Sequence, residues 1–346
     1  MAVSILSYGA STSSTDNTAA INRAIAAAKA LNTTVEIPAG NFRHAGVIRS
    51  DGVMIVGLGD TSILTATRAD TQAVMLTGDG AGISNVKLVG AGGSRLSSYE
   101  AGGIAILDAT NFTVDRVTID HASAAGMHIS GSSNGKITNN VLSYTGADSI
   151  HFSNYEGGNH DVEVSGNRID HSGDDGIAVV SYGGREASYR INVHDNSVVD
   201  QPWGRGYSVV GGNDITIEDN YYDNNIAGFA GIYIASESEY STLPVNNVLV
   251  KDNVIADAGG KHGSIQLYAS GGTIKNVTID NNQIYDSKNV AILLNGGAGQ
   301  SGIAVINNDA YGTQPLLSDQ ANARPTTSAN IAHPATAEPR QMRARR

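Results

Sequence analysis

The sequence of 346 residues has no cysteine, one tryptophan and few charged residues. The lack of cysteine excludes disulfide bonds and thiolate metal sites. No run of 18 apolar residues occurs, so we expect no membrane-spanning segment. The first residues, MAVSILSYGAS, lack a basic start and a long apolar stretch, so we expect no secretory signal peptide in this chain. By contrast, 41 glycines are present, which is typical of a turn-rich β protein.

Basic residues are also scarce, with 22 against 33 acidic ones. The segment from residue 320 to the end holds five of the basic residues and one acidic residue, which leaves 17 against 32 for the rest, a net charge of −15. A body of this charge repels polyanions, so we expect no nucleic-acid partner. The acidity also weighs modestly toward a neutral substrate.

The chain does contain a repeat. A short phrase recurs in which an apolar residue, two variable residues, an asparagine, one variable residue and another apolar residue follow each other. The repeated asparagines are Asn140, Asn167, Asn196, Asn220, Asn253, Asn282 and Asn308. Their intervals are 27, 29, 24, 33, 29 and 26 residues, and self-similarity at such a period is typical of a solenoid.

Each interval holds two or three runs of about five residues with alternating apolar character, separated by Gly, Asn, Asp and Ser. Such runs predict short strands, and a coil of strands and turns with this repeat length is a parallel β-helix. We therefore predict an all-β solenoid. The asparagines are expected to stack from coil to coil in a structural role, because asparagine tolerates left-handed backbone angles and its amide can bond to the coils above and below.

The two ends differ from the middle. Near the start, an apolar stripe predicts an α-helix over about residues 16–31, capped by Asp16 or Asn17, that closes the open end of the coil. We expect one β-helix domain over residues 1–316. Residues 317–346 lose the repeat and are rich in Pro, Arg, Ala and Thr, so we expect a disordered tail there.

One strand in each coil has the form Gly or Ser, apolar, x, apolar, in which the middle residue x points outward. Read along the chain, these outward residues are Ala105, His128, His151, Ala178, Ser208, Tyr233 and Gln266. Equivalent strand residues in successive coils lie about 4.8 Å apart, so they should form one column. Asp148, Asp174, Asp175 and Arg205 come just before these strands. Ionisable, small and aromatic groups therefore converge on one face.

The phrase SGDDGIAVV, residues 172–180, resembles the DDCIAI strand of the polygalacturonase and rhamnogalacturonase glycoside hydrolases, which are right-handed parallel β-helices. One coil earlier, GADS places Asp148 at the position of that family's other aspartate. The resemblance implies that Asp148, Asp174 and Asp175 act together, one as general acid and the others in activating water. The sequence departs from the family where its histidine is replaced by Arg205 and its arginine and lysine by Tyr233 and Ala235. Because that basic pair holds a uronate carboxylate, its loss suggests a neutral or differently charged sugar.

The amino-terminal 45 residues are similar to the start of the broader pectate-lyase-like superfamily, which includes mannuronan C5-epimerases, lyases and phage tailspikes. This likeness implies the fold and leaves the reaction open, because function resides in the site.

The first hypothesis is therefore glycoside hydrolysis by crowded carboxylates whose pKa values are pushed apart. The expected catalytic residues are Asp148, Asp174, Asp175 and His151. The expected substrate-binding residues are His128, Arg205, Tyr233, Tyr182, Arg185, Gln266 and Tyr268. The expected partner is a polysaccharide or oligosaccharide, met outside the cell or at its surface.

Two alternatives remain. A polysaccharide lyase or C5-epimerase could use His151, Tyr233, Arg205 and His128 as acid, base and carboxylate partner on a uronic-acid polymer. A non-catalytic glycan-binding or tailspike-like protein could use the tyrosines as sugar platforms. We expect no required cofactor and no dedicated metal site; calcium is possible, but no loop has a clear ligand spacing. The sequence indicates no oligomeric state.

Overall fold

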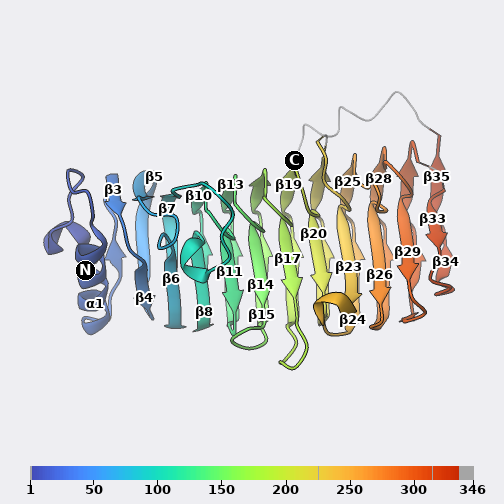
Figure 1. The fold of residues 1–346 in the computed structure, drawn as a ribbon, viewed down its shortest axis with the longest axis horizontal. Coiled ribbons are helices and arrows are strands. Elements are labelled where there is room, and N and C mark those ends of the chain that lie inside the picture. The colour runs from blue at the N-terminus through green and yellow to red at the C-terminus, as the bar shows by residue number, and fades with distance from the viewer. Residues whose placement is uncertain (1, 225, 314, 335–346) are drawn as a thin grey trace.

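The computed structural model describes residues 2–224, 226–313 and 315–334. They wind into a long parallel β-helix whose coils stack along the long axis, with α1 (Thr18–Ala30) at the amino-terminal end (Figure 1). The predicted all-β solenoid is confirmed. Three short 3-10 helices lie within these described residues: η1 (Ile5–Tyr8), η2 (Tyr99–Ala101) and η3 (Ser238–Tyr240).

Three stacks of parallel strands form the walls. The first stack contains β4 (Ile48–Asp51), β6 (Val74–Asp79), β8 (Ile104–Thr110), β11 (Met127–Ser130), β14 (Ile150–Ser153), β17 (Ile177–Val180), β20 (Tyr207–Val210), β23 (Ile232–Glu237), β26 (Ile265–Ser270), β29 (Ile292–Gly296) and β33 (Leu317–Asp319). Its outer surface is called the column face below.

The second stack contains β1 (Val3–Ser4), β2 (Val35–Glu36), β5 (Met54–Ala66), β7 (Gly82–Val89), β9 (Thr113–Asp115), β12 (Ser133–Thr138), β15 (His160–Ser165), β18 (Tyr189–His194), β21 (Gly212–Glu218), β24 (Val245–Lys251), β27 (Ile274–Asp280), β30 (Gln300–Ser301), β31 (Ala304–Ile306) and β34 (Thr326–Ser328). The third contains β3 (Gly40–His44), β10 (Thr118–Asp120), β13 (Val141–Ser143), β16 (Arg168–Asp170), β19 (Ser197–Val199), β22 (Tyr221–Asp223), β25 (Val254–Ala256), β28 (Gln283–Tyr285), β32 (Asp309–Tyr311) and β35 (Ile331–His333). The long strands β5 and β7 bend and belong to both of these stacks.

Apolar side chains fill the interior as one continuous core along the axis. Residues at the same place in successive coils, such as Ile129, Phe152, Val179 and Val209, are paired in register and buried. The helix α1 closes the end of this core with the apolar face that the sequence predicted, formed by Ala20, Ile21, Ala24, Ile25 and Ala28. Each added coil therefore lengthens the buried core along the axis and leaves its width unchanged.

The predicted asparagine stack is a continuous ladder. The side-chain amide of Asn140 donates to the side-chain carbonyl of Asn167 at 2.8 Å, and the same bond recurs along the later asparagines. The ladder asparagines from Asn140 to Asn308 are buried. The left-handed backbone conformation that we expected of them belongs instead to the preceding residues, for example Asn139 and Asp195. The residue before each ladder asparagine thus turns the chain, and the asparagine binds the next coil.

The expected boundary at residue 316 is wrong. The strands β33, β34 and β35 pair with β29, β31 and β32, so the coil continues to residue 333. Asn330 accepts a bond from the Asn308 amide at 3.0 Å and extends the ladder. Composition wrongly predicted disorder here because these mostly exposed strands are held by backbone hydrogen bonds and this amide pair rather than by a large apolar face. Residues 335–346 of the expected tail lie outside the described residues.

Among the helices of the described residues, none combines the length and the apolar character that crossing a membrane requires.

Candidate active site

The predicted outward column is confirmed residue by residue. The register pairs Ala105 with His128, His128 with His151, His151 with Ala178, Ala178 with Ser208, Ser208 with Tyr233 and Tyr233 with Gln266. The asparagine repeat therefore located correctly the face on which ionisable side chains gather.

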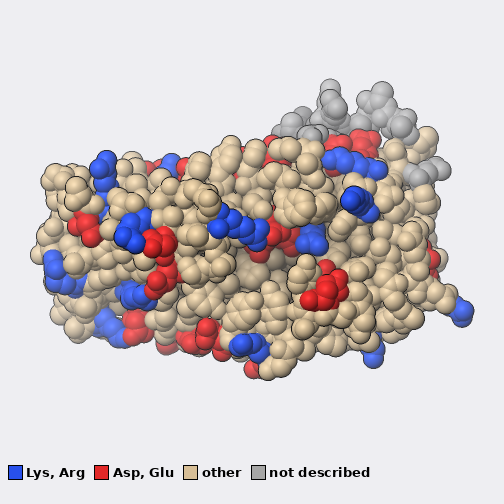
Figure 2. All heavy atoms as spheres, viewed as in Figure 1, with Lys and Arg blue, Asp and Glu red and all other residues tan. Residues whose placement is uncertain are grey.

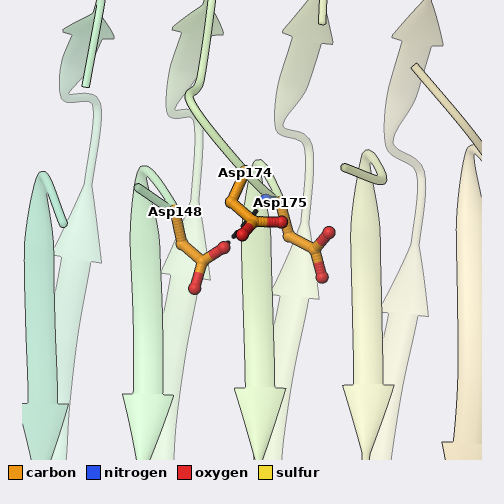
Figure 3. A group of neighbouring side chains, drawn as sticks. All are labelled: Asp148, Asp174 and Asp175. Atoms are coloured by element: carbon orange, nitrogen blue, oxygen red, sulfur yellow. Dashed lines mark hydrogen bonds between the residues drawn. The ribbon is translucent and has the colours of Figure 1, made fainter. Parts of the chain in front are cut away.

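The three aspartates meet at the turns that enter β14 and β17. Asp148 precedes β14, and Asp174 and Asp175 precede β17 in the next coil (Figure 3). The Asp148 carboxylate accepts the Asp175 backbone N–H at 2.8 Å, which holds the two turns together. One carboxyl oxygen from each aspartate lies within 4.8 Å of those of the other two. The trio that the family resemblance implied is thus assembled in space.

Asp175 is the most enclosed of the three, with 5% of its surface exposed. One carboxyl oxygen accepts the Arg205 backbone N–H at 2.8 Å, and the other accepts the Ser208 hydroxyl at 2.5 Å. Burial raises the pKa of Asp175 to about 7; the Arg205 guanidinium opposes this rise, and the Asp148 and Asp174 carboxylates add to it. A carboxyl group that keeps its proton near neutrality can serve as a general acid.

Asp174 is more open and has a cationic partner. Its carboxylate forms an ion pair of 2.8 Å with the Arg95 guanidinium, and its side chain is 22% exposed. Burial and the Asp148 carboxylate raise the pKa of Asp174, while Arg95 and, more weakly, Arg205 oppose the rise. The environments of the adjacent aspartates therefore differ: one faces an arginine at the surface, and the other is enclosed under the next coil.

His151 is bound to the trio directly. Its Nδ1 lies 2.5 Å from the Asp148 carboxylate, so the ring is fixed against that group. The ring of His128 meets that of His151 edge-on at 4.8 Å, and its Nε2 bonds to the Ser153 hydroxyl at 2.8 Å. Burial, together with His151, lowers the pKa of His128 to about 3. His128 is therefore a neutral imidazole at ordinary pH.

Arg205, Tyr233 and Gln266 lie on the opposite side of the aspartates. The Arg205 guanidinium lies over the Tyr233 ring at 4.4 Å and 3.6 Å from the Asp175 carboxylate. The Tyr233 hydroxyl donates to Glu237 at 2.8 Å, and the Gln266 amide donates to Asn295 at 3.0 Å. Tyr233 and Gln266 are buried, so they are less available to a sugar than we expected, because neighbouring side chains cover them. Tyr268 is partly buried and stacks on Tyr233.

Tyr182 and Arg185 follow β17, at the other end of this strand from Asp174 and Asp175. The Tyr182 ring stacks on the Tyr155 ring at 5.0 Å, and the Arg185 guanidinium lies over the Tyr155 ring at 5.5 Å. A pocket of about 220 Å³ lies here, lined by Arg95, Tyr99, His128, Asp148, His151, Tyr155 and Tyr182 among others. Basic and acidic side chains lie side by side around a hollow near the middle of this face (Figure 2).

Sequence reasoning missed Arg95 and Tyr99 and gave Ser208 no role. A signal for the first two was present: fourteen residues separate β7 from β8, whereas six separate β10 from β11, β13 from β14 and β16 from β17. An insertion of that size in a solenoid marks a binding face. Ser208 was predicted to lie in the outward column, but its hydrogen bond to Asp175 could not be predicted from spacing alone.

The trio fits a resident calcium ion poorly. Its oxygens are close enough to share a cation. However, five of the six carboxyl oxygens already have partners: the Asp175 N–H, His151, the Arg205 N–H, Ser208 and Arg95. Calcium takes six to eight oxygen ligands, and two guanidinium groups stand beside this cluster. We therefore derive no chemical step through a metal.

Comparison with a family profile described as "Rhamnogalacturonase A/epimerase, pectate lyase-like" gives a match over residues 2–230, about two thirds of the chain. A comparison with curated protein sequences gives no match.

Solved structures share the fold at low sequence identity. The catalytic domain of a GH87 α-1,3-glucanase in complex with nigerose is 19% identical with a TM-score of 0.77, and the match covers 96% of this chain and 66% of that one. The catalytic unit of a thermostable GH87 α-1,3-glucanase from Streptomyces thermodiastaticus is 19% identical with a TM-score of 0.72, covering 97% and 68%. The A-module of a mannuronan C-5 epimerase from Azotobacter vinelandii is 17% identical with a TM-score of 0.71, covering 96% and 100%. The chain thus spans about two thirds of the glucanase chains that it matches.

Several of the glucanase structures carry single substitutions of aspartate by alanine, in complex with nigerose or tetrasaccharides. Three different aspartates are involved; two of them are adjacent, and the third precedes that pair by 23 residues.

Proposed function

The chain belongs to the pectate lyase-like rhamnogalacturonase A/epimerase family, and we propose that it is a glycoside hydrolase that cleaves a polysaccharide at Asp148, Asp174 and Asp175. The observation that carries this proposal is the carboxyl group of Asp175, which keeps its proton near neutrality beside two other carboxyl groups. Glycoside hydrolysis requires one carboxylic acid and one carboxylate at the same bond.

In the proposed reaction, Asp175 donates its proton to the glycosidic oxygen as the bond between that oxygen and the anomeric carbon breaks. Asp148 and Asp174, as carboxylates, activate the water whose oxygen joins the anomeric carbon, and the proton of that water restores the acid. His151 fixes the orientation of Asp148 through the 2.5 Å bond. One water is consumed for each bond cleaved, so the reaction needs no further reactant.

The relatives' variants support this assignment of residues. In the glucanases the substituted aspartates comprise an adjacent pair and one residue 23 positions earlier. Here Asp174 and Asp175 are adjacent, and Asp148 lies 26 positions before Asp174. Because one coil of this β-helix has about this length, both patterns place a third aspartate one coil before the pair.

We further propose a neutral sugar polymer, such as a glucan, as the substrate. The body of the chain has a net charge of −15, and the Arg205 guanidinium is already stacked on the Tyr233 ring. Arg95 is likewise paired with Asp174. The glucanase relatives bind nigerose, a neutral disaccharide. We propose that the protein acts outside the cell or at its surface.

A screen of neutral polysaccharides, including α-1,3-glucan, and acidic ones, including alginate and polygalacturonate, tests the proposal. Release of reducing ends without new ultraviolet absorbance is the expected result. A product with an absorbing double bond would identify a lyase, a change of sugar configuration without cleavage would identify an epimerase, and binding without any product would identify a glycan-binding protein. Each of these three outcomes contradicts hydrolysis.

Substitution Asp175→Asn tests the role of the acid. We expect kcat to fall by about 10²–10⁴ while oligosaccharide binding persists, because the amide keeps the shape of the side chain and has no acidic proton to transfer. Asp214→Asn, at an exposed position of β21, is the matched control and should retain full activity. An Asp175→Asn variant with unchanged turnover would overturn the assignment of the acid.

A further inference from the structure

The chain between β7 and β8, residues 90–103, is called the β7–β8 segment. It leaves the regular path of the coil and loops out in front of β8 (Figure 1). Its backbone is bound to the following coil, because the Leu96 N–H donates to the Ser123 carbonyl and the Ser123 hydroxyl donates to the Gly92 carbonyl, both at 2.8 Å. The segment therefore has a fixed course over the column face.

Side chains of the segment reach the site itself. Arg95 pairs with Asp174 at 2.8 Å, although its own coil lies three coils before that of Asp174, a distance of about 14 Å at the usual strand spacing. The Tyr99 ring meets the His128 ring edge-on at 4.5 Å. The segment thus spans the face from β8 to the turn before β17.

The pocket of about 220 Å³ lies between the segment and the column face. The segment contributes Arg95, Ser97 and Tyr99 to the walls, and the coils contribute His128, Asp148 and His151. At about 30 Å³ for each water, the volume equals that of about seven waters, which suits one sugar ring and is too small for two. The stacked pair Tyr155 and Tyr182 borders the same space.

The other side of the aspartates is built differently. Only six, seven and eight residues lead into β17, β20 and β23, so these connections are shorter than the fourteen residues that lead into β8. On this side a polysaccharide would lie over the neighbouring side chains that bury Ser208, Tyr233 and Gln266, whereas on the amino-terminal side it meets the β7–β8 segment. The three aspartates stand at the boundary between the pocket and the coils with these short entering connections.

We infer that the β7–β8 segment makes this a chain-end site: the pocket takes one terminal sugar ring, the scissile bond lies at the aspartates, and the rest of the chain extends over β20 to β26. This inference rests on the proposed hydrolase function and adds that cleavage releases one monosaccharide at a time. Arg95 is a positioning residue in this arrangement, because it ties the segment to Asp174.

The experiment uses the full chain and a polysaccharide that the wild-type protein cleaves in the screen above. Products at the earliest time points are separated by chromatography. Monosaccharide as the main early product is expected, whereas a ladder of oligosaccharides would overturn the chain-end inference and leave the hydrolase function intact. If the wild-type protein cleaves nothing in the screen, the proposed function fails and this inference fails with it.

Two substitutions fill the pocket from opposite walls. Ala147→Leu fills it from the coil, and Ser97→Trp fills it from the β7–β8 segment, far in sequence from the aspartates. We expect each to lower kcat/KM about tenfold or more, and the agreement of the two separates a filled pocket from a displaced Asp148. Ala332→Leu, on an exposed site of β35, is the control and should leave activity unchanged. Full activity in both pocket-filling variants would overturn the inference.

Arg95→Ala releases the segment instead of filling the pocket. We expect longer oligosaccharides to join the monosaccharide among the early products, because the wall can move aside. Thermal melting followed by circular dichroism checks that the β-helix is intact. A folded, active Arg95→Ala variant that still releases only monosaccharide would show that the ion pair does not hold the wall, while the pocket-filling variants continue to test the pocket.

Discussion

The Ser208 hydroxyl donates a hydrogen bond to the Asp175 carboxyl group across the boundary between two coils, with 2.5 Å between the oxygens. Ser208 lies in the outward column beside Ala178, on β20, one coil after the aspartate pair. Both partners are buried. The small side chain of Ala178 leaves room for this contact, so two column positions together determine the environment of the proposed acid.

Removal of this bond should shift the pH dependence of catalysis. Burial raises the pKa of Asp175 to about 7, and the Ser208 hydroxyl, which stabilises the ionised form, opposes this rise. In Ser208→Ala the pKa should rise further, and the alkaline limb of the rate profile should move up by about one pH unit. The measurement is kcat/KM against pH, with Ser197→Ala in β19 as control. A shift toward lower pH would contradict the proposed role of Asp175.

The same carboxyl group should make stability depend on pH. In the unfolded chain Asp175 ionises near its ordinary pKa of about 3.9, whereas the folded protein keeps the proton until about pH 7. The folded state therefore binds more protons between these values, and its stability falls as pH rises through this window and then levels off. Relative to Asp175→Asn, the wild-type protein should lose up to about 4 kcal/mol, measured by denaturant unfolding at pH 4 to 8. A constant difference across this range would contradict the buried proton.

The asparagine ladder should be a main source of stability. Asn220→Ala removes the amide bonds to Val193 and Asn253 and leaves the Asn196 amide and backbone N–H without their acceptor. Each buried unsatisfied group costs about 1–3 kcal/mol, so we expect a loss of about 2–4 kcal/mol in the free energy of unfolding. Asn41→Ala, on the exposed side of β3, should change it by less than about 0.5 kcal/mol. Equal effects of the two substitutions would refute this role for the ladder.

Activity should not depend on calcium. Because most carboxyl oxygens of the trio are already bonded and two arginines stand beside them, treatment with a chelator should leave turnover and melting temperature unchanged. The measurement compares the chelated protein with the same protein after addition of excess calcium. A loss of activity that calcium restores would show that the ion displaces these partners.

The sequence was sufficient for those parts of the site that follow the repeat. Strand side chains alternate with a period of two, and the asparagines mark the same place in each coil, so the register of His128, His151 and Ser208 could be counted. The neighbouring turns brought Asp148 to Asp174 and Asp175 for the same reason.

Parts of the site that lie outside the repeat could not be predicted in this way. Arg95 reaches Asp174 from a segment whose path depends on tertiary contacts rather than on any period. The burial of Tyr233 results from contacts with Glu237 and Arg205 that strand alternation does not describe. The strands β33 to β35 were not predicted, because composition reflects apolar content, whereas backbone pairing and one asparagine hold these strands.

The aspartates lie far from either end of the stack of coils, beside the first members of the asparagine ladder, which runs from Asn140 to Asn330. Asp148, Asp174 and Asp175 belong to coils that have several others before and after them (Figure 1). In a linear array each coil contacts only its neighbours, so the outermost coils can unravel under stress while the middle ones keep their shape. The middle coils then keep the strand edges to which a frayed end can pair again.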